Sequence, residues 1–264
     1  MTSVRRSRGF LAAALLLSVA LSCGRPKSAQ ENLKLGVASV ERGDHARAIV
    51  YLTDALRLDP TLARAHLLRG NCYIEKADLS RAVFDFTEAI RLEPDLVEAY
   101  IRRGDCYAEQ GEHDLAIADY TEAIRLDPQS VQAYNNRGAS YDAKGEADKA
   151  LADLNEALKL DPKYKEAYRN RGAYYDRRGE YPKAVADYTA ALKLDPRYRQ
   201  AYTNRGVAYA KNGKYQNAIA DFTEAIALSP DEPINYLNRA KAYRALGNRS
   251  LAADDEQKAR ALKR

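Results

Sequence analysis

Residues that usually carry chemistry are scarce in this sequence of 264 residues, which has no tryptophan, one methionine, three cysteines and three histidines. His45, His66 and His113 lie far apart without metal-ligand spacing, and no phosphate-binding glycine loop or nucleophile elbow occurs. The formal net charge is +5, and three of these positive charges lie in the first ten residues, so residues 23–264 carry only +2. Nucleic-acid binding usually needs a basic stripe. The composition therefore argues against an enzyme, a cofactor, a metal site, a small-molecule substrate and a nucleic-acid partner.

Long hydrophobic runs are also missing, since the longest apolar run, Phe10–Leu21, is too short to cross a bilayer. It follows three arginines, and residues 1–22 contain no acidic residue, which is typical of an export signal peptide. The junction Ala20-Leu21-Ser22-Cys23 resembles a bacterial lipobox, in which Cys23 is lipidated after cleavage. Because Gly24 is not Asp, the resemblance implies an outer-membrane lipoprotein that faces the periplasm, with residues 23–28 as a tether. A soluble exported protein is the alternative.

Two residue patterns recur every 34 residues. One is a proline that follows a leucine and a polar residue, and the other is a glycine that becomes alanine in its seventh occurrence. The prolines are Pro60, Pro94, Pro128, Pro162, Pro196 and Pro230, and the glycine series is Gly36, Gly70, Gly104, Gly138, Gly172, Gly206 and Ala240. A fixed period of this length predicts stacked repeats over residues 29–264, with units that start at 29, 63, 97, 131, 165, 199 and 233.

Apolar residues within each unit recur at three- and four-residue spacings, which predicts helices and an all-α fold. A glycine such as Gly179 divides most units in two, and we expect it to end the first of two helices. Ala77 takes this place in the second unit and should make a less favourable turn. The recurring proline ends the second helix.

The fifth unit shows the pattern most completely, with Ala167-Tyr168, Gly172, Tyr175, Gly179, Ala184, Tyr188, Ala191 and Pro196. This pattern resembles the tetratricopeptide repeat. The resemblance implies a right-handed α-solenoid of about seven 34-residue helix–turn–helix units. It also implies that the first helices line a concave groove that binds a peptide or another protein.

Two charged series distinguish these repeats from the usual pattern. Arginine precedes the glycine series in six units, at positions 69, 103, 137, 171, 205 and 239, and aspartate follows sixteen residues later, at positions 85, 119, 153, 187, 221 and 255. The first unit has Leu35 and Tyr51 instead, so we expect the two series to pair within each unit. We interpret Cys72 and Cys106 as buried thiols without a disulfide, and the tyrosine series that includes Tyr175 as core packing.

The candidate groove residues lie on the first helices towards the C-terminal end, whereas the N-terminal units are apolar there. The candidates are Asn135, Asn136, Arg169, Asn170, Asn204, Lys211, Asn238 and Lys241. Asparagine amides can hold a peptide backbone, and cations favour an acidic partner. The alternative is an ordinary polar surface.

These features predict a non-catalytic scaffold of the bacterial cell envelope that binds a protein or peptide in its groove. One alternative is an assembly factor for pili or outer-membrane proteins. A further alternative, an RNA-binding helical repeat protein, agrees poorly with the export signal and the small net charge of residues 23–264.

Replacing Cys23 with alanine tests the predicted anchor. Without a thiol at the cleavage site, we expect the protein to leave the membrane fraction or to remain an uncleaved precursor, as measured by fractionation and mass spectrometry. A Cys23→Ala protein that is processed and fractionates as the parent does would show that no lipid is attached there.

Overall fold

The structure is a computed structural model that describes residues 27–262, and these residues form fourteen α-helices and no β-strand. The predicted signal peptide, Cys23 and most of the tether lie outside the described residues. The first helices of the repeats are α2 (Ala29–Glu41), α4 (Ala63–Glu75), α6 (Val97–Glu109), α8 (Val131–Ala143), α10 (Lys165–Arg177), α12 (Arg199–Lys211) and α14 (Pro233–Ala245). The second helices are α3 (His45–Leu58), α5 (Leu79–Leu92), α7 (His113–Leu126), α9 (Ala147–Leu160), α11 (Tyr181–Leu194), α13 (Tyr215–Leu228) and α15 (Arg249–Ala261). None of the helices in residues 27–262 has the length and apolar character of a membrane span.

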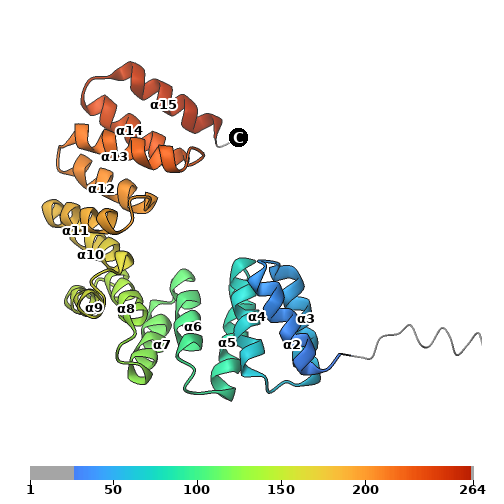
Figure 1. Ribbon diagram of the computed structural model, residues 1–264. Helices are drawn as coiled ribbons and strands as arrows, with labels where there is room; N and C mark the ends of the chain where they lie inside the picture. The colour runs from blue at the N-terminus through green and yellow to red at the C-terminus, as the bar shows by residue number, and fades with distance from the viewer. Residues whose placement is uncertain (1–26, 263–264) are drawn as a thin grey trace, which may run out of the picture. The chain divides into compact units, whose positions relative to one another are not determined.

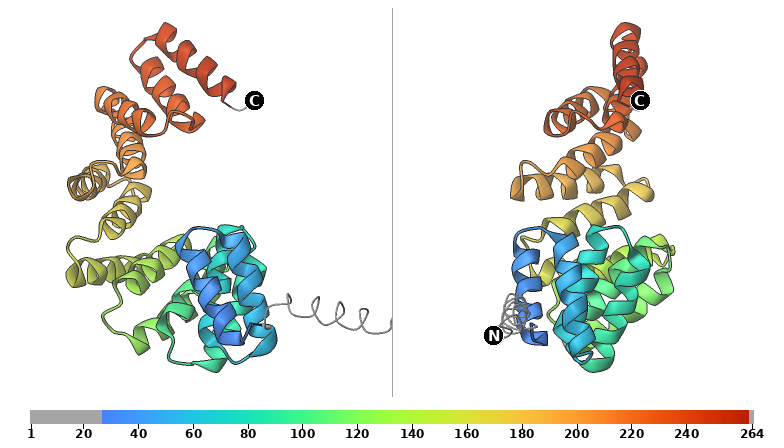
Figure 2. Two further views of the ribbon diagram at one scale, coloured as in Figure 1. Left: turned by 45° about the vertical axis from the view of Figure 1, so that its right-hand side comes forward. Right: turned by 90° about the vertical axis from the view of Figure 1, so that its right-hand side faces the viewer.

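The chain divides between residues 92 and 93 into two compact units, whose described parts are residues 27–92 and 93–262 and which we call the N-terminal and C-terminal units. In the C-terminal unit, each first helix packs against the second helix of its own repeat and against the first helix of the next repeat, as the stack from α10 to α15 in Figures 1 and 2 shows. Among the described residues of either unit, the second helices make no such contacts with one another. The first helices therefore approach more closely and form the inner face of each stack.

The recurring proline and the glycine of the turn between the two helices determine where the helices end. The second helices of repeats 1 to 6 each end directly before Asp-Pro, Glu-Pro or Ser-Pro. Asp195 before Pro196 has extended backbone angles, as steric contact with a proline ring requires. The residue that closes the first helix has a positive φ, which glycine adopts without strain, as Gly179 does at 74°. Ala77 is the only non-glycine residue with a positive φ in the described chain, at 56°, in agreement with the less favourable turn expected there.

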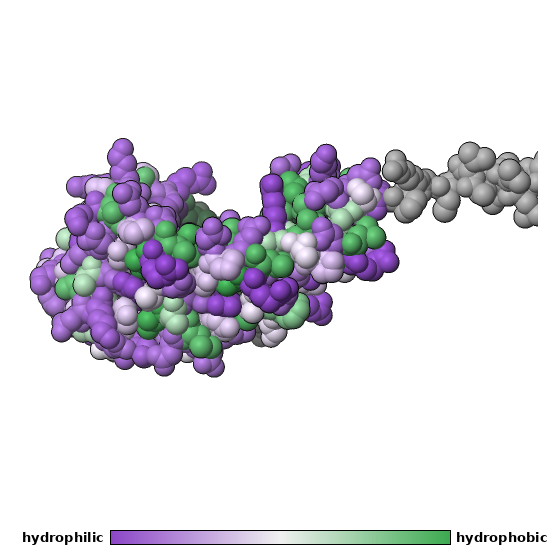
Figure 3. Space-filling model, turned by 90° about the horizontal axis from the view of Figure 1, so that it is seen from below, coloured by the Kyte–Doolittle hydropathy of each residue, from purple (hydrophilic) through white to green (hydrophobic). Residues whose placement is uncertain are grey.

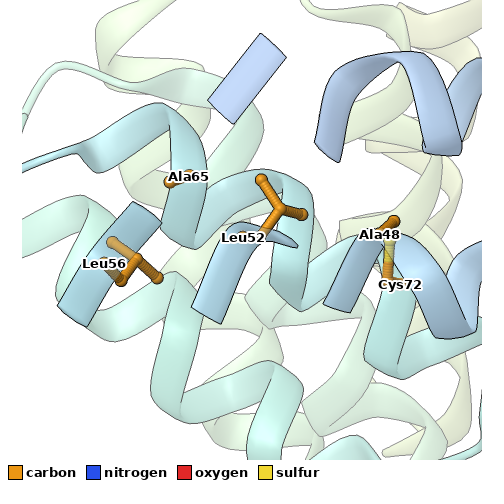
Figure 4. Close-up of a cluster of buried hydrophobic side chains, with 5 residues drawn as sticks. All are labelled: Ala48, Leu52, Leu56, Ala65 and Cys72. Carbon is orange, nitrogen blue, oxygen red and sulfur yellow. The ribbon is translucent and has the colours of Figure 1, made fainter. Parts of the chain in front are cut away.

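In repeats 1 to 6 the core forms where the glycine series meets a large side chain from the second helix. A Cβ atom on Gly172 would lie 2.7 Å from the ring of Tyr188, and one on Gly70 would lie 2.6 Å from Phe86. Glycine at this place lets the two helices approach closely enough to bury the ring. In the N-terminal unit, Leu52 and its neighbours from α3 and α4 form a further apolar cluster, drawn in Figure 4.

All six arginine–aspartate pairs form within repeats, which confirms the predicted pairing. In each pair Nε donates to Oδ2 and Nη2 donates to Oδ1, with distances of 2.7–2.9 Å. The arginine side chains are 14–22% exposed and those of the aspartates at most 10%, so water screens these pairs weakly. Hydrogen bonds from Arg171 to Asp187 raise the pKa of the guanidinium, against the effect of burial.

These arginines donate a further hydrogen bond that the repeat pattern does not predict. Nη1 of Arg171 donates to Oδ1 of Asn155, sixteen residues earlier, at 2.7 Å, and so joins the repeat to the preceding one. In four other repeats the acceptor is a threonine Oγ1 at 2.9–3.1 Å, in the pairs Arg69–Thr53, Arg137–Thr121, Arg205–Thr189 and Arg239–Thr223. Each of these arginines therefore fixes its own helix pair and also links two repeats.

Tyrosine side chains flank the arginines. The guanidinium of Arg137 lies 5.6 Å from the ring centre of Tyr134 and 5.9 Å from that of Tyr141, on the same helix. Tyr141 and Tyr175 are partly buried and pack on the core, as predicted, but their series also covers the ion pairs. In the second repeat, His66 replaces the first of these tyrosines, and its Nδ1 lies 2.9 Å from Oδ1 of the fully buried Asp85.

The thiols of Cys72 and Cys106 are free and 1% exposed. Burial raises the pKa of the Cys72 thiol to about 11 and that of Cys106 to about 12. Both residues therefore pack as small apolar side chains at neutral pH.

A double-mutant cycle on Arg171 and Asp187 tests the energetic coupling of an ion pair. Either change to alanine leaves a largely buried charge without its partner, and we expect each to lower the free energy of unfolding by about 1–3 kcal/mol. The double mutant should lose clearly less than the sum in urea unfolding curves. The exposed pair Arg125 and Glu122 is the control, where we expect nearly additive effects. Strict additivity at Arg171 and Asp187 would contradict the coupling.

Candidate functional site

A cavity of about 350 Å³ opens on the inner face of the C-terminal unit, between the first helices of repeats 3, 4 and 5. We call it the asparagine cavity. Its walls are Asp105 and Ala108 of α6, His113 and Tyr120 of α7, Asn135, Asn136, Ala139 and Ser140 of α8, Tyr164, and Glu166, Arg169 and Asn170 of α10.

A chain of side-chain hydrogen bonds crosses this cavity from α10 to α6. Asn170 donates through Nδ2 to Oδ1 of Asn135, which donates to Oδ1 of Asn136, which donates to Oδ1 of Asp105. Each of these distances is 2.8 Å. Tyr120 donates its hydroxyl to the same Asp105 oxygen, also at 2.8 Å. Three amides from repeats 4 and 5 are thus held in one orientation by a carboxylate from repeat 3, and we call this chain the amide relay.

Asp105 sets the direction of the relay, because an ionised carboxylate only accepts hydrogen bonds. Asn136 must turn its NH₂ group towards Asp105, so its carbonyl oxygen faces Asn135 and accepts a hydrogen bond from it. Asn135 therefore turns its NH₂ group towards Asn136 and its carbonyl oxygen towards Asn170. The relay therefore ends at the carbonyl oxygen of Asn170, which accepts no hydrogen bond within residues 27–262. This oxygen, on the wall of an open cavity, can accept a hydrogen bond from a ligand N–H group.

Burial dominates the electrostatics of the titratable groups here. It raises the pKa of Asp105, although hydrogen bonds from Tyr120 and Asn136 and the nearby charge of Arg102 oppose the shift. It also raises the pKa of Tyr120, and raises that of Tyr164 to about 12. Both phenols are therefore neutral hydrogen-bonding groups at neutral pH.

Arg169 provides the positive charge beside the open end of the relay. Its guanidinium makes no ion pair within the described chain, although it hydrogen-bonds to Tyr198. Burial raises the pKa of Tyr198, and the Arg169 charge opposes that shift. An arginine without a carboxylate partner, next to an open amide oxygen, suits a ligand that has both an acidic group and a backbone N–H group.

The structure brings half of the predicted groove residues together. Asn135, Asn136, Arg169 and Asn170 line one cavity, whereas Asn204, Lys211, Asn238 and Lys241 lie outside it on α12 and α14. Lys211 is paired, because its Nζ lies 2.5 Å from Oδ2 of Asp176 in the preceding repeat. Lys241 is exposed, and Asn204 and Asn238 are partly buried.

The carboxylate that anchors the relay, Asp105, was not among the residues predicted from the sequence. Asp105 follows the repeat glycine directly, a place that holds Ala139, Ala173 and Val207 in the next three repeats. Asp105 is the one acidic residue at this place, which also holds Val37, Asn71 and Lys241 in the remaining repeats, and this was the available signal. The sequence offers no such signal for Tyr120, because an aromatic residue at its place is typical of the repeat core.

The inner face of the N-terminal unit has a different character. A cavity of about 320 Å³ there is lined mainly by apolar side chains and aliphatic stems, among them Leu33, Lys34 and Val37 of α2. On the face of the molecule shown in Figure 3, hydrophilic side chains predominate and hydrophobic ones form separate patches. Within residues 27–262, no three His, Cys, Asp or Glu side chains are grouped as a metal site would require.

Comparisons with known families agree with the repeat pattern. Family models described as "Tetratricopeptide repeat" match residues 39–84, 131–164, 169–233 and 204–263, and one described as "TPR repeat" matches residues 104–145. The comparison with curated proteins gives no match.

Several solved structures share the fold. A tetratricopeptide repeat protein from Parabacteroides merdae ATCC 43184 is 23% identical with a TM-score of 0.73, over 89% of this chain and 93% of that one. PilW, described as a widely conserved type IV pilus biogenesis factor, is 21% identical with a TM-score of 0.70, over 76% and 93%. YrrB, described as a TPR protein with an unusual peptide-binding site, is 22% identical with a TM-score of 0.50, over 70% and 95%. These identities establish likeness of fold alone.

Asn136→Asp tests the amide relay, because it places a second carboxylate beside Asp105. Like charges raise the pKa of the pair in the folded state, so stability is lost above that pKa and recovered as the pH falls through it. We expect urea unfolding at about pH 7.5 to show a loss of about 1–3 kcal/mol that shrinks at about pH 4.5. Asn204→Asp, at the same place two repeats later, is the matched control. Equal losses for the two variants at both pH values would contradict the relay.

Proposed function

The chain belongs to the tetratricopeptide repeat family, and from this premise we propose that it is a non-catalytic scaffold that holds a segment of a partner protein on the inner face of its C-terminal unit. The observation that carries the proposal is the amide relay, which ends in an open carbonyl oxygen on the wall of the asparagine cavity. A relay of fixed direction is preorganised, so a ligand does not have to order it.

An extended peptide suits the chemistry of this cavity. Its backbone offers N–H groups to the oxygen of Asn170 and C=O groups to the remaining amide hydrogens, and an acidic side chain can reach Arg169. The cavity volume of about 350 Å³ corresponds to a few side chains, so it is one subsite of a longer contact along the first helices. YrrB, described as having an unusual peptide-binding site, has a related fold and supports the choice of a peptide ligand.

We further propose that the protein acts in the bacterial cell envelope, anchored through lipid on Cys23 to the outer membrane and facing the periplasm. The lipobox-like junction and the signal-like residues 1–22 support this location. A soluble exported form remains the alternative, and the Cys23→Ala fractionation separates the two.

A role as an assembly factor is the second candidate function. The similarity in fold to PilW favours it, since PilW is described as a pilus biogenesis factor. Both functions use the same inner face, and they differ in whether the partner leaves after assembly. A stable complex with an envelope enzyme or structural protein supports the scaffold, whereas transient capture of pilus or outer-membrane subunits supports the assembly factor.

Photo-crosslinking from the inner face tests the proposal. A photoreactive residue in place of Asn204 lies on this face but outside the amide relay, and we expect it to capture a partner in intact cells. Replacing both Arg169 and Asn170 with alanine should reduce that capture at least about fivefold, because the ligand loses a charged contact and an amide contact. Circular dichroism should show an unchanged helix content.

The matched control places the photoreactive residue at Glu122, on a second helix. We expect little capture from Glu122, and none that depends on Arg169 or Asn170. Capture from Glu122 that survives both alanine changes, with none from Asn204, would place the partner outside the inner face.

A further inference from the structure

Six places on each first helix represent the inner face of the C-terminal unit: the second, fifth, sixth, ninth, twelfth and thirteenth residues. The third and tenth places, which hold Asn235 and Ser140, also reach a neighbouring first helix or line the asparagine cavity, but they hold no charged residue in repeats 3 to 7. Glu166, Arg169 and Asn170 occupy the second, fifth and sixth places in repeat 5 and line the cavity. Asp142, at the twelfth place of repeat 4, binds Arg177 at the thirteenth place of repeat 5.

Formal charge over these six places changes steadily along the stack. It is −2 in repeat 3, −1 in repeat 4, 0 in repeat 5, +1 in repeat 6 and +2 in repeat 7. The charged residues are Glu98, Arg102, Asp105 and Glu109 in repeat 3, Asp142 in repeat 4, Glu166, Arg169, Asp176 and Arg177 in repeat 5, Lys211 in repeat 6, and Lys241 and Arg244 in repeat 7. The charges at these places sum to zero over the five repeats, so net charge alone does not reveal this order.

Ion pairs between repeats have the same direction as this gradient. Asp142 binds Arg177 in the next repeat, and Asp176 binds Lys211 in the next repeat. Charges in the middle of the stack therefore compensate one another. Glu109 in repeat 3 and Lys241 in repeat 7 are exposed and make no ion pair within the described chain, so uncompensated charge of opposite sign remains towards the two ends.

We propose that this gradient selects a partner segment whose own charges are separated, and that it fixes the direction in which the segment lies. The basic end of the segment lies over repeats 3 and 4, and the acidic end lies over repeats 6 and 7. This inference rests on the proposed function and adds to it the charge pattern and the orientation of the ligand.

The dimensions of the stack allow the two ends to act separately. Neighbouring first helices lie about 10 Å apart, so repeats 3 and 7 are separated by several times the Debye length of about 8 Å at physiological salt. Each end of the inner face therefore attracts its own part of the ligand. Complementary charge of this kind acts mainly on orientation and association rate.

Synthetic peptides of identical composition provide the test. One peptide has lysines in its N-terminal half and glutamates in its C-terminal half, a second has the reverse order, and a third has the two residues mixed. We expect fluorescence anisotropy to show that both segregated peptides bind about five- to tenfold more tightly than the mixed peptide, and that the difference shrinks at high salt.

Orientation is measured with a photoreactive group on the acidic end of each segregated peptide. We expect crosslinks to repeats 6 and 7 for both peptides, whichever terminus is acidic. The variant Glu109→Lys with Lys241→Glu abolishes the charge difference between repeats 3 and 7 without changing net charge, and it should remove the preference for segregated peptides. Asp148→Lys with Lys193→Glu makes the same exchange on exposed sites of second helices and should leave the preference intact.

Three outcomes would overturn the inference: equal binding of segregated and mixed peptides, crosslinks unrelated to the acidic end, or tighter binding of an all-glutamate peptide or single-stranded RNA. The proposed function is judged separately by capture from Asn204 in cells. If that capture persists while the peptides show no preference, the scaffold function stands and the directional gradient does not. Loss of the Asn204 capture removes the function itself.

Discussion

The arginine–aspartate pair is the interaction on which the rest of this structure depends. Its two hydrogen bonds join the helices of one repeat, and in five repeats a third N–H group of the guanidinium reaches the preceding repeat. Arginine suits this task because its planar group donates in several fixed directions at once. A charged pair in a helix interface is costly unless both partners are satisfied, and the preceding repeat supplies the third acceptor of the guanidinium. The arginines thus couple neighbouring repeats to one another within each of the two compact units.

The site depends on the opposite property, which is variation between repeats. Residues that recur in six of the seven units, such as Gly172 and Asp187, build the frame and leave no freedom for recognition. Places near the glycine vary more: Asp105 and Asn135 each occur in one repeat alone, and there they meet Asn136 and Asn170. A carboxylate in one repeat thereby orients amides in the next two. Specificity in such a protein comes from pairs of substitutions in adjacent units, because neither residue forms the arrangement alone.

Much of the fold could be predicted from the sequence, because a strict 34-residue period makes each structural rule visible several times. The pairing of Arg171 with Asp187 followed from their joint absence in the first repeat, and the strained turn at Ala77 followed from a missing glycine. The hydrogen bond from Arg171 to Asn155 did not follow, since nothing in a linear pattern distinguishes an acceptor sixteen residues earlier from a surface side chain. The relay could not be predicted either. It needs the distances between neighbouring first helices, which single residues such as Asp105 do not encode.

The backward direction of the arginine links gives the stack two unlike ends. Each link runs from the guanidinium of one repeat to a hydroxyl or amide of the repeat before it, as from Arg239 to Thr223. Removing the last repeat would leave only a threonine hydroxyl, which water satisfies readily. Removing the repeat that supplies the acceptor would instead leave an arginine N–H group without a hydrogen bond, next to a largely buried ion pair. Arrays of this design are therefore easier to lengthen or shorten at the C-terminal side, and duplication of repeats during evolution would be tolerated there first.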